Sequence, residues 1–190
     1  MKRIFVCLVL VLLLALPVFA ASGDSKGVAM LKEVLKDEIG FYFMDNAGFM
    51  TLSELCDPEG PYRAFSFSVV EMYGDGEPVV VVNVGDQLLL RYYDDTELVY
   101  GWLFDSRAMQ MIRKNGVFHA SGGASVGEYC RLAFDNLQYE VVILAEYDEE
   151  EGKYVLMGKV VSKEEFDAFI EDLPGFAEEF ELTDENIEKW

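Results

Sequence analysis

The feature that most constrains this fold is a regular alternation of short apolar segments and turn signals between residues 63 and 157. Segments rich in β-branched and aromatic residues recur at a spacing of roughly 8 to 12 residues, which is typical of antiparallel strands joined by turns. The expected strands are Arg63–Tyr73, Val79–Val82, Gln87–Tyr93, Leu98–Phe104, Val117–Ala120, Glu128–Phe134, Leu137–Tyr147 and Tyr154–Met157. No strand–helix–strand alternation is visible, so a parallel nucleotide-binding sheet is not expected.

Turn-forming residues separate these segments. Val84-Gly85-Asp86 and Asp94-Asp95-Thr96 each interrupt apolar runs, and Gly74-Asp75-Gly76 is expected to form a tight turn. Asn115-Gly116 is a strong hairpin signal and is expected to join residues 107–112 to the strand beginning at Val117. The pattern predicts an antiparallel β meander.

Helical patterns flank the meander. Apolar residues at three- and four-residue steps predict a helix over Gly27–Ile39, ending at Gly40. Ser162 followed by Glu165 is a capping box, which predicts a helix over Lys163–Leu173. The expected fold class is α+β, with an N-terminal helix, an antiparallel meander and a C-terminal helix.

The segment before the meander and the C-terminus give weaker signals. Residues 41–61 form an irregular apolar segment with no clear pattern. Thr183 is expected to cap a second helix near the C-terminus, and Trp190 is expected to pack onto the sheet.

The N-terminus has the three parts of a signal peptide. A basic start at Lys2 and Arg3 precedes an apolar run over Ile4–Leu16, and small residues end at Ala20. The apolar run is shorter than the roughly 20 residues of a membrane-spanning helix. The sequence therefore predicts a signal peptide over 1–20, a linker over 21–26 and one globular domain over 27–190. It also predicts a secreted or extracytoplasmic location and no stable membrane anchor after cleavage.

The charge balance restricts the partners. The chain has 15 basic and 35 acidic residues, a net charge of −20 at pH 7. A surface this acidic repels phosphate backbones, so nucleic acid is not an expected partner. For a secreted chain, the expected partner is an extracellular protein or glycan whose identity the sequence does not give.

Two segments carry a family resemblance. The letters VVEMYGDGEPVV from Val69 to Val80 resemble the segment D-x-D-G-D-G-x-P-E-L of FG-GAP and VCBS-type repeats. The same segment occurs in small uncharacterised exported proteins of gut-type anaerobic bacteria, and Gly158–Phe166 resembles their G-K-x-V-S/T hairpin followed by an E-E-F helix. The resemblance covers roughly Phe65 to Trp190 and implies an architecture without a reaction.

In intact copies of that segment the aspartates can hold calcium. The resemblance places Glu71, Tyr73 and Asp75 at the three aspartate positions, and Val79 at that of a later glutamate. Calcium takes 6–8 oxygen ligands, and only Glu71 and Asp75 keep a carboxylate. The segment is either a weak calcium loop or, as we favour, a hairpin turn without metal, and no cofactor is expected.

Motifs for catalysis lack their context. The letters GASVG from Gly123 to Gly127 match the nucleophile elbow around Ser125, but that elbow needs a strand–turn–helix context and a later histidine. The only histidine, His119, precedes it and could be imagined as a partner of Cys130. Cys56 and Cys130 could instead form a disulfide or remain two buried thiols. The acidic run Asp148–Glu151 fits a solvated turn, and no catalytic residue is expected.

Aromatic residues provide the remaining lead. Tyr92, Tyr93, Tyr100 and Trp102 lie on neighbouring expected strands, where they would form either a ligand-binding sheet face or ordinary core. The function that this sequence favours is a secreted, non-catalytic binding or interaction module. The alternative is an extracellular hydrolase that uses paired carboxylates, although the sequence singles out no pair.

Overall fold

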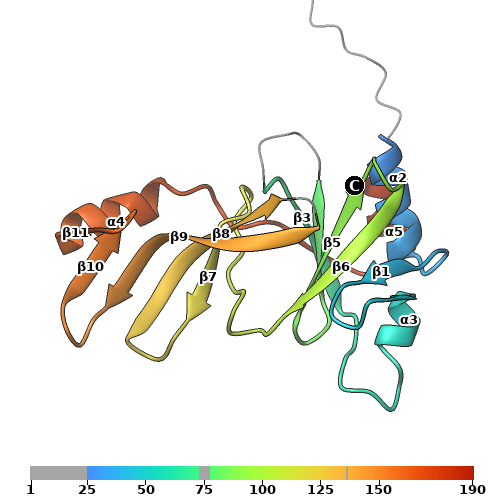
Figure 1. Ribbon diagram of the computed structural model, residues 1–190, viewed down its shortest axis with the longest axis horizontal. Coiled ribbons are helices and arrows are strands. Elements are labelled where there is room, and N and C mark those ends of the chain that lie inside the picture. The colour runs from blue at the N-terminus through green and yellow to red at the C-terminus, as the bar shows by residue number, and fades with distance from the viewer. Residues whose placement is uncertain (1–24, 73–77, 136) are drawn as a thin grey trace, which may run out of the picture.

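In the computed structural model of this protein, the described residues form two β-sheets and four helices (Figure 1). The structure describes residues 25–72, 78–135 and 137–190. The predicted signal peptide, most of the predicted linker and the turn predicted at Gly74-Asp75-Gly76 lie outside these residues.

The larger sheet has seven strands in the order β12-β3-β4-β5-β6-β1-β2. Its strands are β1 (Phe41–Phe43), β2 (Gly48–Met50), β3 (Ser66–Val70), β4 (Val79–Asn83), β5 (Gln87–Tyr93), β6 (Leu98–Phe104) and β12 (Glu179–Glu181).

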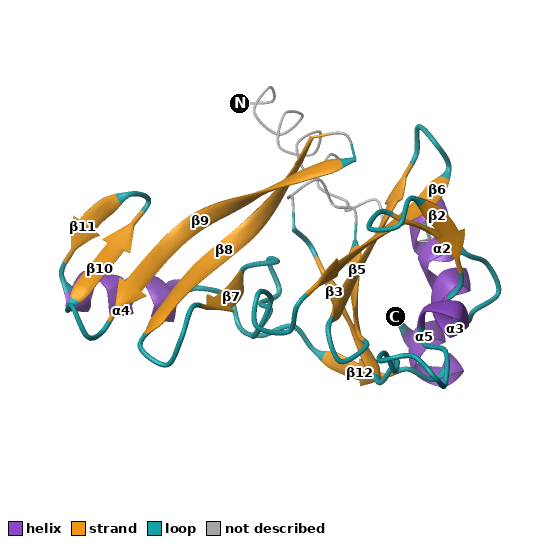
Figure 2. Ribbon diagram, turned by 60° about the horizontal axis from the view of Figure 1, so that its bottom comes forward, coloured by secondary structure: helices purple, strands orange, loops and turns teal. Residues whose placement is uncertain are grey.

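The smaller sheet has five strands in the order β11-β10-β9-β8-β7. Its strands are β7 (Phe118–Ser121), β8 (Val126–Asp135), β9 (Gln138–Asp148), β10 (Lys153–Leu156) and β11 (Lys159–Val161). The helices are α2 (Lys26–Leu35), α3 (Leu52–Leu55), α4 (Lys163–Asp172) and α5 (Asp184–Lys189). Figure 2 shows that the long β8–β9 ribbon extends from the α4 end of the molecule toward the seven-stranded sheet.

The fold class predicted from the sequence, α+β with helices near both ends, is confirmed. Strands β3 to β6 form an antiparallel meander, and β7 to β11 form a second one. The bounds predicted for β5 and β6 match the structure, and Gly85 takes a left-handed φ of 97° in the turn before β5.

The prediction of one continuous antiparallel meander is corrected in two respects: the strands form two sheets, and β1 adds to the first sheet in parallel with β6. The parallel pairing places Phe43 beside Gly101. A Cβ atom on Gly101 would lie 2.6 Å from Cδ2 of Phe41, so glycine lets β1 approach β6 closely.

The segment between β6 and β7 carries the chain from one sheet to the other. The Asn115-Gly116 turn forms there, with Gly116 at a φ of 73° and its N–H donating to the carbonyl of Arg113 at 2.8 Å. Residues 107–112, predicted as the strand partner, contribute one isolated bridge between Gln110 and His119, and Arg113 forms another with Phe176.

The seven-stranded sheet is buried on both faces. One face packs under α2 and α5, around Leu31, Val82 and Ile187. The other packs under the smaller sheet, around Leu89, Trp102 and Leu132. Because both faces are buried, the four valines of β4 are all buried, and the alternation typical of a half-exposed strand is absent there.

Helix α2 is shorter than the predicted Gly27–Ile39 and begins one residue earlier, inside the predicted linker. Ser25 caps its start by accepting a hydrogen bond from the N–H of Val28 at 3.3 Å. Asp37 takes a left-handed φ of 62° just after the helix, so the chain turns before Gly40, which leads into β1 instead of ending the helix. The segment predicted as irregular, residues 41–61, contains β1, β2 and α3.

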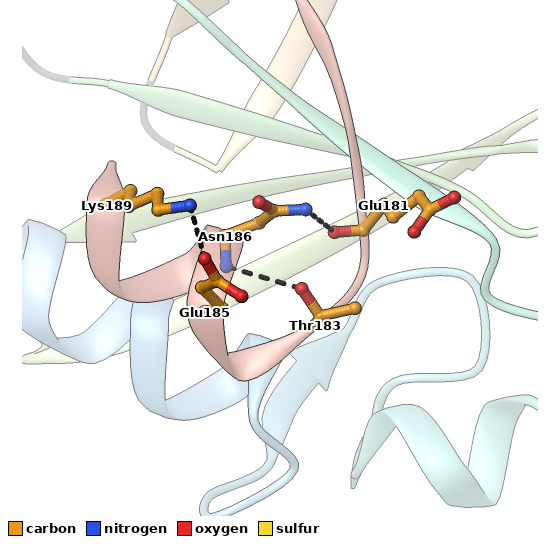
Figure 3. Close-up of polar contacts among 5 residues, drawn as sticks. All are labelled: Glu181, Thr183, Glu185, Asn186 and Lys189. Atoms are coloured by element: carbon orange, nitrogen blue, oxygen red, sulfur yellow. Dashed lines mark hydrogen bonds and ion pairs between the residues drawn. The ribbon is translucent and has the colours of Figure 1, made fainter.

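The C-terminal segment adds β12 to the seven-stranded sheet, which the sequence did not predict, and then forms the predicted cap at Thr183 and the predicted packing of Trp190. Thr183 caps α5 by accepting a hydrogen bond from the N–H of Asn186 at 3.3 Å, and the Asn186 side chain donates to the carbonyl of Glu181 at 3.0 Å (Figure 3). The ion pair between Lys189 and Glu185 spans the same short helix. The Trp190 ring packs 6.3 Å from the ring of Phe67 in β3.

None of the helices among the described residues combines the length and the apolar character that crossing a bilayer requires.

Candidate functional site

A polar hollow opens at one corner of the seven-stranded sheet, on the face that the smaller sheet covers elsewhere. Its floor includes Asn83 and Gln87, which are direct cross-strand neighbours, and Ser68 on the next strand. Buried Ser66 lies opposite Asn83 but does not itself line the hollow. Directly paired residues of antiparallel strands share a face of the sheet. Glu179 on β12 pairs with Ser68 and extends this polar floor to the sheet edge. The hollow has a volume of about 310 Å³, at the lower end of the range for small-molecule sites.

Hydrogen bonds hold one side of the floor. The Ser66 hydroxyl donates to Glu179, and the Asn83 amide donates to the same carboxylate oxygen at 3.5 Å. The other Asn83 side-chain atom, Oδ1, accepts from the N–H of Gly85 at 3.1 Å. These contacts fix the Glu179 carboxylate before any ligand arrives.

Three other polar side chains in the hollow are not committed to the protein. Ser68, Gln87 and Gln110 line it and make no side-chain hydrogen bond among the described residues. A hydroxyl and two amides offer both donors and acceptors. They are therefore available to a ligand with several hydrogen-bonding groups.

The rim of the hollow is apolar and braced. Met111 and Phe176 are 55% and 52% exposed, although both are large apolar side chains. The Arg113 guanidinium lies 4.8 Å from the centre of the Phe176 ring and donates to the carbonyl of Pro174 at 2.8 Å. The N–H of Ala177 donates to the carbonyl of Ile112 at 2.8 Å, which ties the two rim segments together.

The charge of the lining selects among ligands. None of the described residues that line the hollow is basic, and its one charged group is Glu179. The nearby Arg113 guanidinium lies against the Phe176 ring and the Pro174 carbonyl and does not line the hollow, so an anionic ligand would have no counter-charge inside it and would meet a chain of net charge −20. The arrangement suits a neutral molecule with hydroxyl groups on one side and an apolar face on the other.

The four aromatic residues singled out from the sequence lie in the protein core and do not line this hollow. Tyr92, Tyr100 and Trp102 are 7%, 6% and 4% exposed. Tyr92 belongs to the cluster on the helix side of the sheet, whereas Tyr93, Tyr100 and Trp102 belong to the cluster between the sheets. The Trp102 ring packs 4.9 Å from the ring of Phe134 on β8.

The two cysteines are free and lie in different layers. Half-buried Cys56 packs at the edge of the helix-side cluster, and Cys130 is buried between the sheets. The sequence allowed either a disulfide or two free thiols, and the structure shows two free thiols. Burial, together with the nearby Glu128 carboxylate, raises the pKa of the Cys130 thiol to about 12, which keeps it protonated and unreactive.

His119 does not face Cys130. His119 pairs with Tyr129 and Phe118 pairs with Cys130, so the two side chains project from opposite faces of the smaller sheet. The imidazole Nε2 instead lies 3.0 Å from the hydroxyl of Tyr147. A Cβ atom on Gly127 would lie 2.4 Å from that Nε2 atom, so a glycine leaves room for this pair.

Ser125 and the acidic run Asp148–Glu151 form hydrogen bonds that shape their turns. Ser125 lies in the connection between antiparallel strands β7 and β8, and its hydroxyl donates to Glu150 at 2.8 Å. Asp148 accepts from the N–H groups of Glu150 and Glu151, both at 3.0 Å, which shapes the acidic turn.

Glu71 and Asp75 are the two carboxylates that remain in the segment resembling a calcium loop. Glu71 is exposed, its N–H donates to the carbonyl of Lys114 at 3.2 Å, and Asp75 lies outside the described residues. In the part of the chain that the structure describes, no three His, Cys, Asp or Glu side chains gather closely enough to bind a metal ion.

One pair of carboxylates is brought together by sheet register. Glu128 on β8 lies opposite Glu146 on β9, beside a hollow of about 160 Å³ that Asp148, Glu151 and Lys153 also line. Sequence reasoning did not single out this pair, because it depends on a register that includes a β-bulge between Tyr129 and Cys130.

Comparisons with known proteins found no matching family model and no similar curated protein or solved structure. The signal of the hollow in the sequence was polar residues that interrupt apolar strands, namely Ser66 and Ser68 around Phe67, and Asn83 after the valine run.

Proposed function

We propose that this protein is an exported, non-catalytic binding module that holds a neutral, hydroxyl-rich ligand of the carbohydrate class in the sheet-corner hollow. The observation that carries the proposal is the group of polar side chains that line the hollow, Ser68, Asn83, Gln87 and Glu179, on a sheet face that is otherwise apolar. Export rests on the signal-peptide pattern of residues 1–20.

The composition of the hollow supports this ligand class. A sugar ring offers hydroxyl groups in its plane and C–H groups on its faces. The uncommitted amides of Gln87 and Gln110 can bind the hydroxyls, and the exposed rings and thioethers at Phe176 and Met111 can cover a C–H face. The held carboxylate of Glu179 adds a charge-assisted acceptor.

A titration of the purified protein with neutral oligosaccharides tests the proposal, with binding measured by calorimetry and by NMR. We expect neutral sugars to bind and their uronic-acid counterparts to bind more weakly, because the hollow lacks a cation. Removing one hydrogen-bonding amide, as in Gln87→Ala or Gln110→Ala, should weaken binding by roughly tenfold, since a hydrogen bond contributes about 1 kcal/mol or more.

A matched pair of variants separates the hollow from the general surface. Phe176→Ala removes an exposed ring at the rim, and Phe49→Ala removes a ring of 61% exposure that does not line the hollow. We expect only Phe176→Ala to weaken sugar binding. Equal effects of the two variants, or no binding of any sugar in the panel, would contradict the proposal.

The alternative function, an extracellular hydrolase, is supported by one observation. Glu128 and Glu146 are cross-strand neighbours, and a pair of carboxylates is what glycoside hydrolysis needs. Hydrolysis of a polysaccharide that is abolished by Glu128→Gln or Glu146→Gln, with binding in the sheet-corner hollow unchanged, would favour this alternative.

A further inference from the structure

Half of strand β9 has an open edge. β9 spans Gln138–Asp148, whereas β10 pairs only with the four residues from Ala145 to Asp148. The N–H of Met157 reaches the carbonyl of Leu144 at 2.9 Å, and among the described residues no strand pairs with the outer edge of Gln138–Ile143.

Sheet register shows which backbone groups face that edge. The N–H and C=O of His119 both bond to Gln110, so they point away from β8. Because these directions alternate along antiparallel strands, Cys130 directs its backbone groups toward β7, and Arg131 directs them toward Val142 on β9. The residues on either side of Val142 therefore turn their N–H and C=O groups outward.

The residues of this edge with outward backbone groups also carry exposed apolar side chains. Tyr139, Val141 and Ile143 have outward backbone groups by this alternation, and they are 41%, 45% and 41% exposed. They lie opposite Phe134, Leu132 and Cys130 on the sheet face that contributes to the core. An open strand edge with an apolar row is a template for pairing with another strand.

We propose that this edge, residues Tyr139–Ile143 of β9, is a homodimer interface in which β9 pairs antiparallel with β9 of a second copy around a two-fold axis at Val141. The outward residues Tyr139, Val141 and Ile143 are centred on Val141. A two-fold axis there places Val141 opposite Val141, and Tyr139 opposite Ile143, of the other copy, so every outward N–H and C=O finds a partner.

The side chains in this register support a second copy as the occupant. The apolar row of one protomer meets the apolar row of the other. Glu140, the one charged residue of Tyr139–Ile143, lies opposite Val142 of the other copy and not opposite Glu140. The edge is therefore complementary to itself.

The net charge of each chain sets the salt dependence. Two chains of net charge −20 repel each other, and added salt screens that repulsion over a Debye length of about 10 Å at 0.1 M. The dimer should therefore tighten as salt rises. A basic peptide bound to the same edge would show the opposite trend, because screening would weaken its attraction.

Sedimentation equilibrium of the purified protein tests the proposal across protein concentration, at about 0.05 M and about 0.5 M NaCl. We expect a monomer–dimer equilibrium that shifts toward the dimer at high salt. Val141→Glu and Val141→Lys should each weaken the dimer at least tenfold, because each places like charges opposite one another at the two-fold axis. An equimolar mixture of the two variants should restore it, since Glu then faces Lys.

A backbone variant gives a second test that does not depend on charge. Val141→Pro removes an outward N–H, so dimerisation should be lost while pairing with β8 persists. Val141→Thr keeps that N–H and is the matched control, and circular dichroism reports whether each variant folds. A monomer under all conditions, or a dimer that the Glu and Lys variants leave intact, would overturn the proposal.

Discussion

A single histidine is placed where protonation opposes folding. One ring nitrogen of His119 contacts the Tyr147 hydroxyl, and the other, Nδ1, is buried with no hydrogen-bond partner among the described residues. Burial lowers the pKa of His119 below its ordinary value of 6.5. The unfolded chain therefore binds a proton at a higher pH than the folded chain does.

The consequence for stability has a definite sign. Below about pH 6.5 the unfolded state takes up the proton first, so the free energy of unfolding falls as the pH drops through the window between the unfolded and folded pKa values. We expect His119→Gln, which does not titrate, to lose less stability than the natural protein between about pH 7 and about pH 5.5. Urea unfolding at both pH values measures this, and equal losses in the two proteins would contradict it.

At the scale of elements, α4 depends on one side chain more than on its cap. Phe166 is 5% exposed and packs against the rings of Tyr129, Tyr147 and Tyr154, at centroid distances of 6.3, 5.9 and 5.3 Å. Among the described residues, the cluster around it contains two other buried residues, Ala145 and Tyr154. The α4 end of the smaller sheet is therefore held by a small core of its own.

We expect Phe166→Ala to remove about 3–5 kcal/mol from the packing of this end, because it deletes a buried ring. Amides of β10, β11 and α4 should then exchange hydrogen faster than those of β4 and β5, since the rest of the fold does not rely on this cluster. Asp167→Asn removes an exposed ion pair with Lys163 and leaves the side chains of the Phe166 cluster in place, so it serves as the control, with an expected change below about 1 kcal/mol. Uniform loss of protection across both sheets would show instead that the molecule opens as one unit.

The same scale shows what local sequence signals could predict. The bounds of β5 and β6 and the capping box at Ser162 and Glu165 follow from residues close together in the chain, and all three match the structure. Strand β1 was missed because its pairing with β6 joins Phe43 to Gly101, far apart in the sequence. Such long-range pairing leaves no local period to detect.

At the scale of the whole molecule, the two-sheet arrangement explains why the candidate site was not predicted. The strand pattern cannot show that the chain leaves the first sheet after β6 and that β7 to β11 form another. The hollow needs that arrangement, because the smaller sheet leaves the polar corner of Ser68, Asn83 and Gln87 uncovered. The polar residues were readable from the sequence, but their shared position was set by register and layering.

The layering also separates the two cysteines and sets their reactivity. The seven-stranded sheet lies between them, with half-buried Cys56 on the helix side and buried Cys130 on the other. Burial is the main cause that raises the pKa of both thiols, to about 12 for Cys130, and the thiolate is the reactive form. Cys130 is therefore protected from reagents both by its burial between the two sheets and by the protonation of its thiol.

We expect iodoacetamide to modify Cys56 slowly in the folded protein and to leave Cys130 untouched, whereas both react in urea. Reductant should not change the melting temperature, because no disulfide joins the two residues. Mass spectrometry of peptides after native and denaturing alkylation measures this, with Cys56→Ser as the control that should leave no native modification at either position. Native modification of Cys130 at a rate similar to that of Cys56 would mean that the interface between the two sheets opens readily, and a melting temperature lowered by reductant would mean that the two layers are linked covalently.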